Sequence, residues 1–148
     1  MKILAIFFSF FLVVSSCSES DPEDKNAKQV PLEGSAQKWE LVRMTGSMIN
    51  SETVGDDMDW QEYYILRPDS TFLKQREHNG GKTTATGFYK LVEQEKESYF
   101  ELTFETGKEL VASCSGNGKE TLMFTGYMLY STWNACDGPG LEYRLAKE

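Results

Sequence analysis

Residues capable of catalysis are sparse in this chain. Its one histidine, His78, directly precedes Asn79-Gly80-Gly81, a sequence typical of a tight hairpin turn, so we expect His78 to lie exposed at the tip. Nucleophilic catalysis needs a serine or cysteine, a base and a group that orients the base. The sequence has no G-x-S-x-G, HExxH or glycine-rich phosphate-binding motif. We therefore predict no catalytic residues and a protein that is not an enzyme.

The densest acidic cluster comprises Asp56, Asp57 and Asp59, next to Trp60. Oxygen-rich loops can bind Ca²⁺ and paired acids can hydrolyse glycosides, so a calcium site and a hydrolase are alternatives here. The cluster lacks the full ligand spacing of an EF-hand loop, and we predict a solvated loop with no metal and no cofactor. Because residues 46–60 are long for a hairpin connection, this loop is also a candidate contact for a partner or ligand.

Cys114 and Cys136 form a further candidate pair. No histidine lies near either cysteine and no C-x-x-C spacing occurs, which disfavours zinc. In an oxidising compartment such a pair is more often bridged than free. We predict a disulfide that stabilises the fold by about 3 kcal/mol. Trp133, close to Cys136, is expected either to pack beneath the bridged loop or to stand at an interface.

Cys17 follows an apolar run from Ile3 to Val14 and two serines, and Lys2 precedes the run. This order is typical of a signal peptide, and the run is shorter than the ~20 residues of a membrane-spanning helix. The arrangement resembles a bacterial lipobox, in which cleavage leaves the cysteine lipidated. We predict a signal peptide over residues 1–16 and a lipid anchor at Cys17 that binds the membrane. An ordinary secretory signal is the alternative.

Residues 17–36 are predicted to be a lipidated flexible tether, because residues 18–26 are polar and acidic and cannot pack. Residues 18–26 also resemble the acidic export signal of some Gram-negative surface lipoproteins. The resemblance implies an outer membrane lipoprotein exposed at the cell surface, and a plain spacer on a periplasmic lipoprotein is the alternative. The formal net charge of −8 argues against nucleic acid as a partner.

From residue 37 onward the chain is typical of short strands joined by turns. Residues 98–105 alternate apolar and polar side chains, the pattern of a half-buried antiparallel strand. Gly87, inside a strand, is expected to mark a bulge or bend. The expected strands span residues 38–44, 62–67, 71–77, 83–92, 98–105, 109–114, 120–125, 127–132 and 141–145. We predict one all-β domain over residues 37–148, with no helix and the strand spacing of a sandwich or barrel.

Four short motifs follow one another along this domain: Trp39-x-Leu41, Leu66-Arg67-Pro68-Asp69-Ser70-Thr71-Phe72, Gly87-Phe88-Tyr89 and Tyr143-Arg144. In order and spacing they resemble the lipocalin-like domains of bacterial lipoproteins. The resemblance implies an antiparallel up-and-down β-barrel of about eight strands. It also implies a structural pair in which Arg144 lies across the ring of Trp39, a contact of about 0.5–2 kcal/mol.

A closed barrel of this size is either filled by side chains or holds one small ligand. The candidate ligand-binding residues are those expected to face the lumen: Trp39, Tyr64, Leu66, Phe72, Tyr89, Phe100, Leu102, Phe104 and Phe124. Leu41, Leu91 and Leu122 are expected beside them. The first hypothesis is binding of a small hydrophobic molecule in the barrel. The alternative is a filled-barrel module for protein interaction in the cell envelope, and an acid-residue hydrolase is a weaker one.

Overall fold

The computed structural model describes residues 34–147. The predicted signal peptide, Cys17 and most of the predicted tether lie outside the described residues. The strands are β1 (Gln37–Thr45), β2 (Glu52–Thr53), β3 (Gln61–Leu66), β4 (Thr71–His78), β5 (Gly81–Gln94), β6 (Glu97–Thr106), β7 (Lys119–Phe124), β8 (Met128–Ser131) and β9 (Gly140–Leu145). Short 3-10 turns are η1 (Gly55–Asp57), η2 (Lys108–Leu110) and η3 (Trp133–Cys136). In the part of the chain described, no helix has the length and apolarity to cross a membrane.

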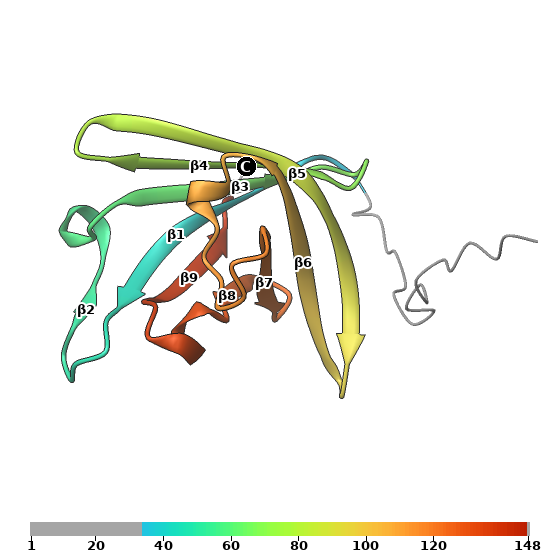
Figure 1. Cartoon of the computed structure of the whole chain (residues 1–148). Coiled ribbons are helices and arrows are strands. Elements are labelled where there is room, and N and C mark those ends of the chain that lie inside the picture. Colours follow the sequence, from blue (N-terminus) through green and yellow to red (C-terminus); the bar gives the residue numbers. More distant parts are fainter. Residues whose placement is uncertain (1–33, 148) are drawn as a thin grey trace, which may run out of the picture.

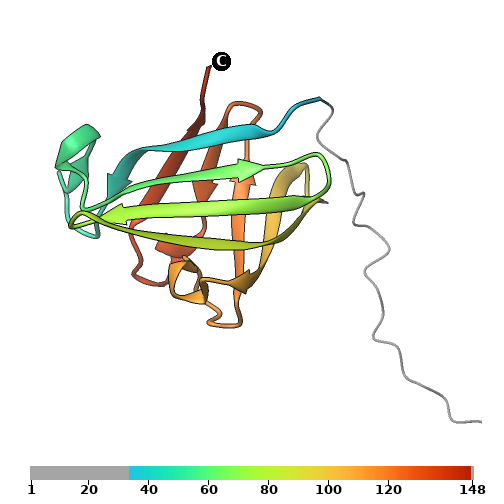
Figure 2. The same ribbon diagram turned by 90° about the horizontal axis from the view of Figure 1, so that it is seen from above.

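The strands form one antiparallel sheet that closes on itself (Figure 1). Their hydrogen-bonded order is β2-β1-β3-β4-β5-β6-β7-β8-β9, and β1 also pairs with β9. In Figure 2, β7, β8 and β9 run steeply across the direction of β3 and β4. The all-β, up-and-down barrel predicted from the sequence is confirmed: it has 8 strands, and β2 is an extra strand on β1. Closure removes the free strand edges that promote aggregation.

Alternation of side chains along each strand decides what fills the barrel. In β6, Phe100, Leu102 and Phe104 are buried, whereas Thr103 between them is exposed. Successive side chains of a strand point to opposite faces of the sheet, so one face supplies the interior and the other meets solvent. This confirms the alternation predicted for residues 98–105.

Two β-bulges bend the long strands. One lies between Thr86 and Gly87, and a Cβ atom at Gly87 would stand 2.0 Å from the carbonyl oxygen of Thr103. Only glycine permits this approach of two backbones, which confirms the bulge predicted at Gly87. The other bulge lies in β1 and lets both Leu41 and Met44 face the interior.

Residues 109–114 do not form the predicted strand. They lie in η2 and in the irregular segment after it, and β6 pairs directly with β7. We call residues 107–118, which connect these two strands, the cap loop. Leu110 and Ala112 of this loop are buried, because contacts with the barrel interior, described below, hold their backbone. Tertiary contacts therefore override the local preference for a strand.

The two ends of the barrel differ in their connections. The start of β1 at Gln37 lies at one end, together with the tight turn between β3 and β4 (Figure 2). Residues 46–60, the β4–β5 turn and the cap loop lie at the opposite end, as the alternating strand directions require. We call this second end the capped end.

Candidate functional site

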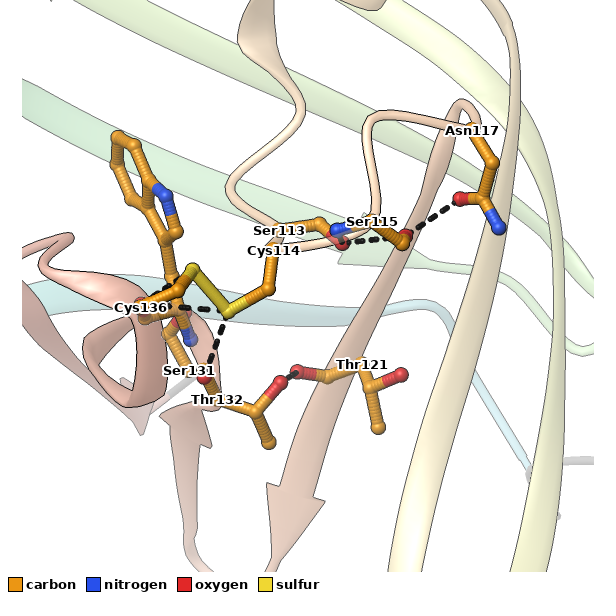
Figure 3. The surroundings of a disulfide bond; sticks show 9 residues. Ser113, Cys114, Ser115, Asn117, Thr121, Ser131, Thr132 and Cys136 are labelled. Atoms are coloured by element: carbon orange, nitrogen blue, oxygen red, sulfur yellow. Dashed lines mark hydrogen bonds between the residues drawn. A yellow bond between two sulfur atoms is a disulfide. The ribbon is translucent and has the colours of Figure 1, made fainter.

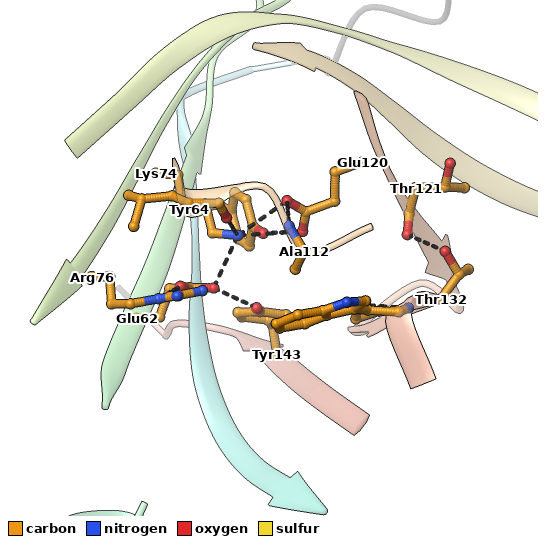
Figure 4. Close-up of polar contacts among 12 residues, drawn as sticks. Glu62, Tyr64, Lys74, Arg76, Ala112, Glu120, Thr121, Thr132 and Tyr143 are labelled. Carbon is orange, nitrogen blue, oxygen red and sulfur yellow. Dashed lines mark hydrogen bonds and ion pairs between the residues drawn. The ribbon is translucent and has the colours of Figure 1, made fainter. Parts of the chain in front are cut away.

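A buried lysine lies inside the barrel (Figure 4). The side chain of Lys74 is fully buried. Its Nζ donates to the carbonyl oxygen of Leu110 at 2.8 Å and lies 3.1 Å from Glu120 Oε2 and 3.2 Å from Glu62 Oε1. Lys74 points inward because it stands two residues after the buried Phe72 on the same face of β4.

Glu62, on β3, connects the lysine to two further side chains. The hydroxyl of Tyr143 donates to Glu62 Oε1 at 2.6 Å, and Arg76 Nε donates to Oε2 at 2.5 Å. The Arg76 guanidinium also stacks on Trp60, with Cζ 4.3 Å from the ring centroid. Glu62 is thus held on both oxygens, and Arg76 joins the network to the capped end.

Glu120, on β7, ties the cap loop to the barrel. Its Oε1 accepts a hydrogen bond from the hydroxyl of Tyr64, and its Oε2 accepts one from the backbone N–H of Ala112 at 3.1 Å. Lys74 binds the carbonyl of Leu110 in the same loop. The ion pair of Lys74 and Glu120 therefore satisfies one backbone acceptor and one backbone donor of the cap loop.

The buried polar network comprises Glu62, Tyr64, Lys74, Arg76, Glu120 and Tyr143. Burial raises the pKa of Glu120, and the nearby Lys74 opposes this rise. Burial also raises the pKa values of Tyr64 and Tyr143 well above their usual range, and the neighbouring glutamates add to the effect. Both tyrosines therefore act as neutral donors. The network pairs two basic side chains, Lys74 and Arg76, with two acidic ones, Glu62 and Glu120, so their formal charges cancel.

The network is organised to hold structure. Burying a charge is costly unless it is paired and hydrogen-bonded, and here the carboxylate oxygens and the ammonium group all meet partners. A hydrophobic ligand that displaced these groups would leave charges unpaired. The geometry therefore favours a filled interior.

The sequence analysis missed this network, although a signal was present. Charged residues are almost never fully buried unless they are paired, which is why they were not assigned to the lumen. Yet each of these charged residues stands two positions from a residue that was assigned to the lumen, and residues two apart in a strand lie on the same face. These pairs are Glu62 with Tyr64, Lys74 with Phe72, and Glu120 with Leu122.

The predicted ligand-binding residues do come together in the barrel interior. They are Trp39, Tyr64, Leu66, Phe72, Tyr89, Phe100, Leu102, Phe104 and, partly buried, Phe124. Several pack edge-to-face on one another: Trp39 and Phe124 have ring centroids 6.0 Å apart, and Phe72 and Phe104 have centroids 4.9 Å apart. Such pairs are typical of a packed core. A role in binding a ligand stays a prediction.

The predicted contact between Trp39 and Arg144 is wrong. Trp39 is fully buried, whereas Arg144 is exposed and pairs in register with Glu40 on the outer face of the sheet. Adjacent strand residues point to opposite faces, and the one that faces inward is Tyr143. The ring of Trp39 packs on Phe124 instead.

The predicted disulfide is confirmed (Figure 3). The Sγ atoms of Cys114 and Cys136 are 2.09 Å apart, and their Cα atoms are 5.7 Å apart. The bond joins the cap loop to η3. Trp133, on η3, is partly buried and packs against the core, as the first of its two expected roles requires.

The acidic cluster lies in a turn at the capped end. Asp56, Asp57 and Asp59 are exposed, whereas Met58 among them is buried. Met58, directly after η1, therefore anchors the loop and leaves the carboxylates in solvent. Within residues 34–147, no group of three histidine, cysteine or acidic side chains is placed to hold a metal. His78 is exposed at the hairpin tip, as predicted.

Comparisons of the chain with protein-family models, curated proteins and solved structures gave no match.

Proposed function

We propose that this chain is a lipid-anchored lipoprotein of the cell envelope with a lipocalin-like barrel, and that it is a non-enzymatic interaction module whose interior is filled. The observation that carries the proposal is the fully buried Lys74 between Glu62 and Glu120. A site for an apolar molecule is a largely apolar, preformed cavity, and here a charged network occupies part of the interior. Replacing paired charges by an apolar guest would leave those charges uncompensated.

Binding of a small hydrophobic molecule in the barrel is the second candidate. The aromatic side chains of the interior favour it, since Trp39, Phe100 and Phe124 pack together at the end of the barrel away from the charged network. Such a ligand would require these rings to move apart, because Trp39 and Phe100 are buried against their neighbours. The filled barrel needs no rearrangement, and we prefer it.

The lipid anchor is proposed at Cys17, where the apolar run and small residues of the N-terminus end. We place the anchored chain on the outer membrane of a Gram-negative bacterium, exposed at the cell surface, because of the acidic residues that follow the cysteine. More than one acyl chain is needed for stable membrane binding, and lipoproteins of this class carry two or three.

The capped end is the proposed contact for a protein partner. Its loop carries the two most exposed large apolar side chains among the described residues, Met48 at 79% and Ile49 at 93%. The loop lies at the end of β1 opposite to Gln37, where the proposed tether enters (Figure 2). Because the proposed tether joins the barrel at the other end, the capped end would stay free of the anchor and accessible to another envelope protein.

Metabolic labelling with a radioactive fatty acid tests the anchor. We expect the full chain to incorporate label and to sediment with membranes, and Cys17→Ser to lose both properties because the lipidated thiol is gone. Cys114→Ser is the control, since it also removes a cysteine and should keep the label. Label retained by Cys17→Ser would contradict the proposal.

A further inference from the structure

We infer that the outer face of β6–β9 carries a binding site for a neutral saccharide, separate from the barrel interior and beyond the proposed function. A groove with a volume of about 510 Å³ lies on this face beside η3, within the size range of small-ligand sites. The side chains that define it are Thr45, Tyr99, Met123, Tyr130, Asn134 and Glu142.

The floor of the groove is a row of outward-facing side chains that crosses the strands. Tyr99 of β6 lies opposite Met123 of β7, Met123 opposite Tyr130 of β8, and Tyr130 opposite Glu142 of β9. Neighbouring strands are about 4.8 Å apart, so the two tyrosine positions, separated by β7, lie about 10 Å apart. All four side chains are half-buried. This row offers two aromatic rings at about the spacing of the first and third rings of a β-1,4-linked trisaccharide.

The groove offers no free charge to an ionic ligand. Its carboxylate, Glu142, accepts a hydrogen bond from Arg43 Nη2 at 2.7 Å. Glu52 lies on the other side of the same guanidinium, 3.3 Å from Nη1. The chain as a whole carries a formal charge of −8, which repels anions. The ligand chemistry that fits is therefore neutral.

Polar groups suited to hydroxyls surround the aromatic floor. The hydroxyl of Tyr130 and the amide of Asn134 make no hydrogen bond within the described part of the chain. The hydroxyl of Tyr99 donates to Glu97, which orients the Tyr99 ring. An amide and a phenol both donate and accept, so together they can recognise a ligand that presents several hydroxyls.

The wall of the groove is held in place before any ligand arrives (Figure 3). Thr132 Oγ1 donates to the carbonyl oxygen of Thr121 at 3.1 Å, and the Trp133 N–H donates to Ser131 Oγ at 3.1 Å. The disulfide at Cys136 fixes the end of η3. A preorganised wall lowers the entropic cost of binding.

The backbone of this face argues for a saccharide over a peptide. Strands β6, β7, β8 and β9 are each paired on both sides, so no edge is free to accept a peptide as an added strand. A sugar ring presents an apolar C–H face and a rim of hydroxyls. The electron-rich faces of tyrosine attract the former, and the amide and phenol bind the latter.

Titration followed by nuclear magnetic resonance tests this inference. The probe is cellotriose or N,N′,N″-triacetylchitotriose, added to the ¹⁵N-labelled Cys17→Ser full chain up to about 20 mM, which would nearly saturate a site with a Kd of about 1 mM. We expect saturable shifts confined to the amides of residues 99, 123 and 130–135. Tyr130→Ala should weaken binding at least about 10-fold, whereas Tyr130→Phe should keep most of the affinity because the ring remains.

Tyr63→Ala is the matched control, since Tyr63 is also a half-buried, outward-facing tyrosine, but on β3. We expect it to leave sugar binding unchanged. The spectrum of each variant shows whether the barrel is folded. Absence of saturable shifts, shifts elsewhere on the molecule, equal loss in Tyr63→Ala, or tighter binding of an acidic sugar or an apolar peptide would each overturn the inference.

Discussion

At the scale of single residues, the barrel depends on Lys74. Its ammonium is the cation that both Glu62 and Glu120 contact in the interior. Removing one partner of a buried pair leaves an uncompensated charge, which costs about 3–5 kcal/mol. We expect Lys74→Met to lower the free energy of unfolding by about this amount, measured by urea denaturation.

The matched control is Lys90→Met, because Lys90 pairs with Glu101 at the surface at 3.0 Å and such pairs contribute at most about 1 kcal/mol.

Lys74 is the neighbour that lowers the raised pKa of Glu120, so Lys74→Met should raise that pKa further. A carboxyl whose folded pKa lies above its unfolded value adds stability in acid and loses it as pH rises through the folded pKa. The deficit should therefore grow from acidic to neutral pH. An equal deficit in both variants would contradict this account.

The residues of the network show what the sequence could and could not predict. Strand alternation fixes the direction of Glu62, Lys74 and Glu120, so their place inside was within reach of the pattern. The pattern could not predict that these three side chains pair, because their pairing depends on how strands far apart in sequence meet across the barrel. The resemblance to lipocalin-like domains predicted a contact between Trp39 and Arg144 that does not form, whereas strand alternation predicts that Arg144 faces outward.

At the scale of elements, the cap loop is held by two kinds of contact. Lys74 and Glu120 bind its backbone from within, and the Cys114–Cys136 disulfide joins it to η3. We expect Cys114→Ser combined with Cys136→Ser to lower the free energy of unfolding by about 3 kcal/mol. Amide hydrogen exchange in residues 107–118 should become faster. The exchange rates of β3 and β4 should keep the same rank among those of the strands.

Ser113→Ala combined with Ser115→Ala is the control for the cap loop. It removes three exposed hydrogen bonds beside the disulfide: the one between the two serine hydroxyls, the one from the Ser115 N–H to Ser113 Oγ, and the one from Ser115 Oγ to Asn117 Oδ1. Because all three are exposed, stability should change by less than about 0.5 kcal/mol. If the cysteine variant matches this control in both stability and exchange, the disulfide does not hold the loop.

Most strands could be predicted because alternation and turn residues agree, as in residues 98–105 and at Asn79-Gly80-Gly81. The strand predicted over residues 109–114 is wrong because of tertiary contacts. Side chains of the barrel interior bind the backbone of Leu110 and Ala112, so the segment does not join the sheet. The boundary of a strand is set by its neighbours as much as by its own residues.

At the scale of the whole molecule, closure and filling act together. The sheet closes through β1 and β9, and the interior combines an aromatic layer at one end with the buried polar network nearer the capped end. The result is a packed interior, with the loops and the outer face of the sheet left to solvent. This is why we propose that recognition takes place at the surface of the barrel.

Native mass spectrometry tests the filled interior most directly. The sample is the Cys17→Ser full chain, secreted into an oxidising compartment and purified without added ligand. We predict the bare protein mass, and no change in tryptophan fluorescence when a panel of fatty acids is added, because Trp39 is packed against Phe124. A discrete adduct of a few hundred daltons, together with saturable quenching by one of the fatty acids, would show an open lumen and contradict the account.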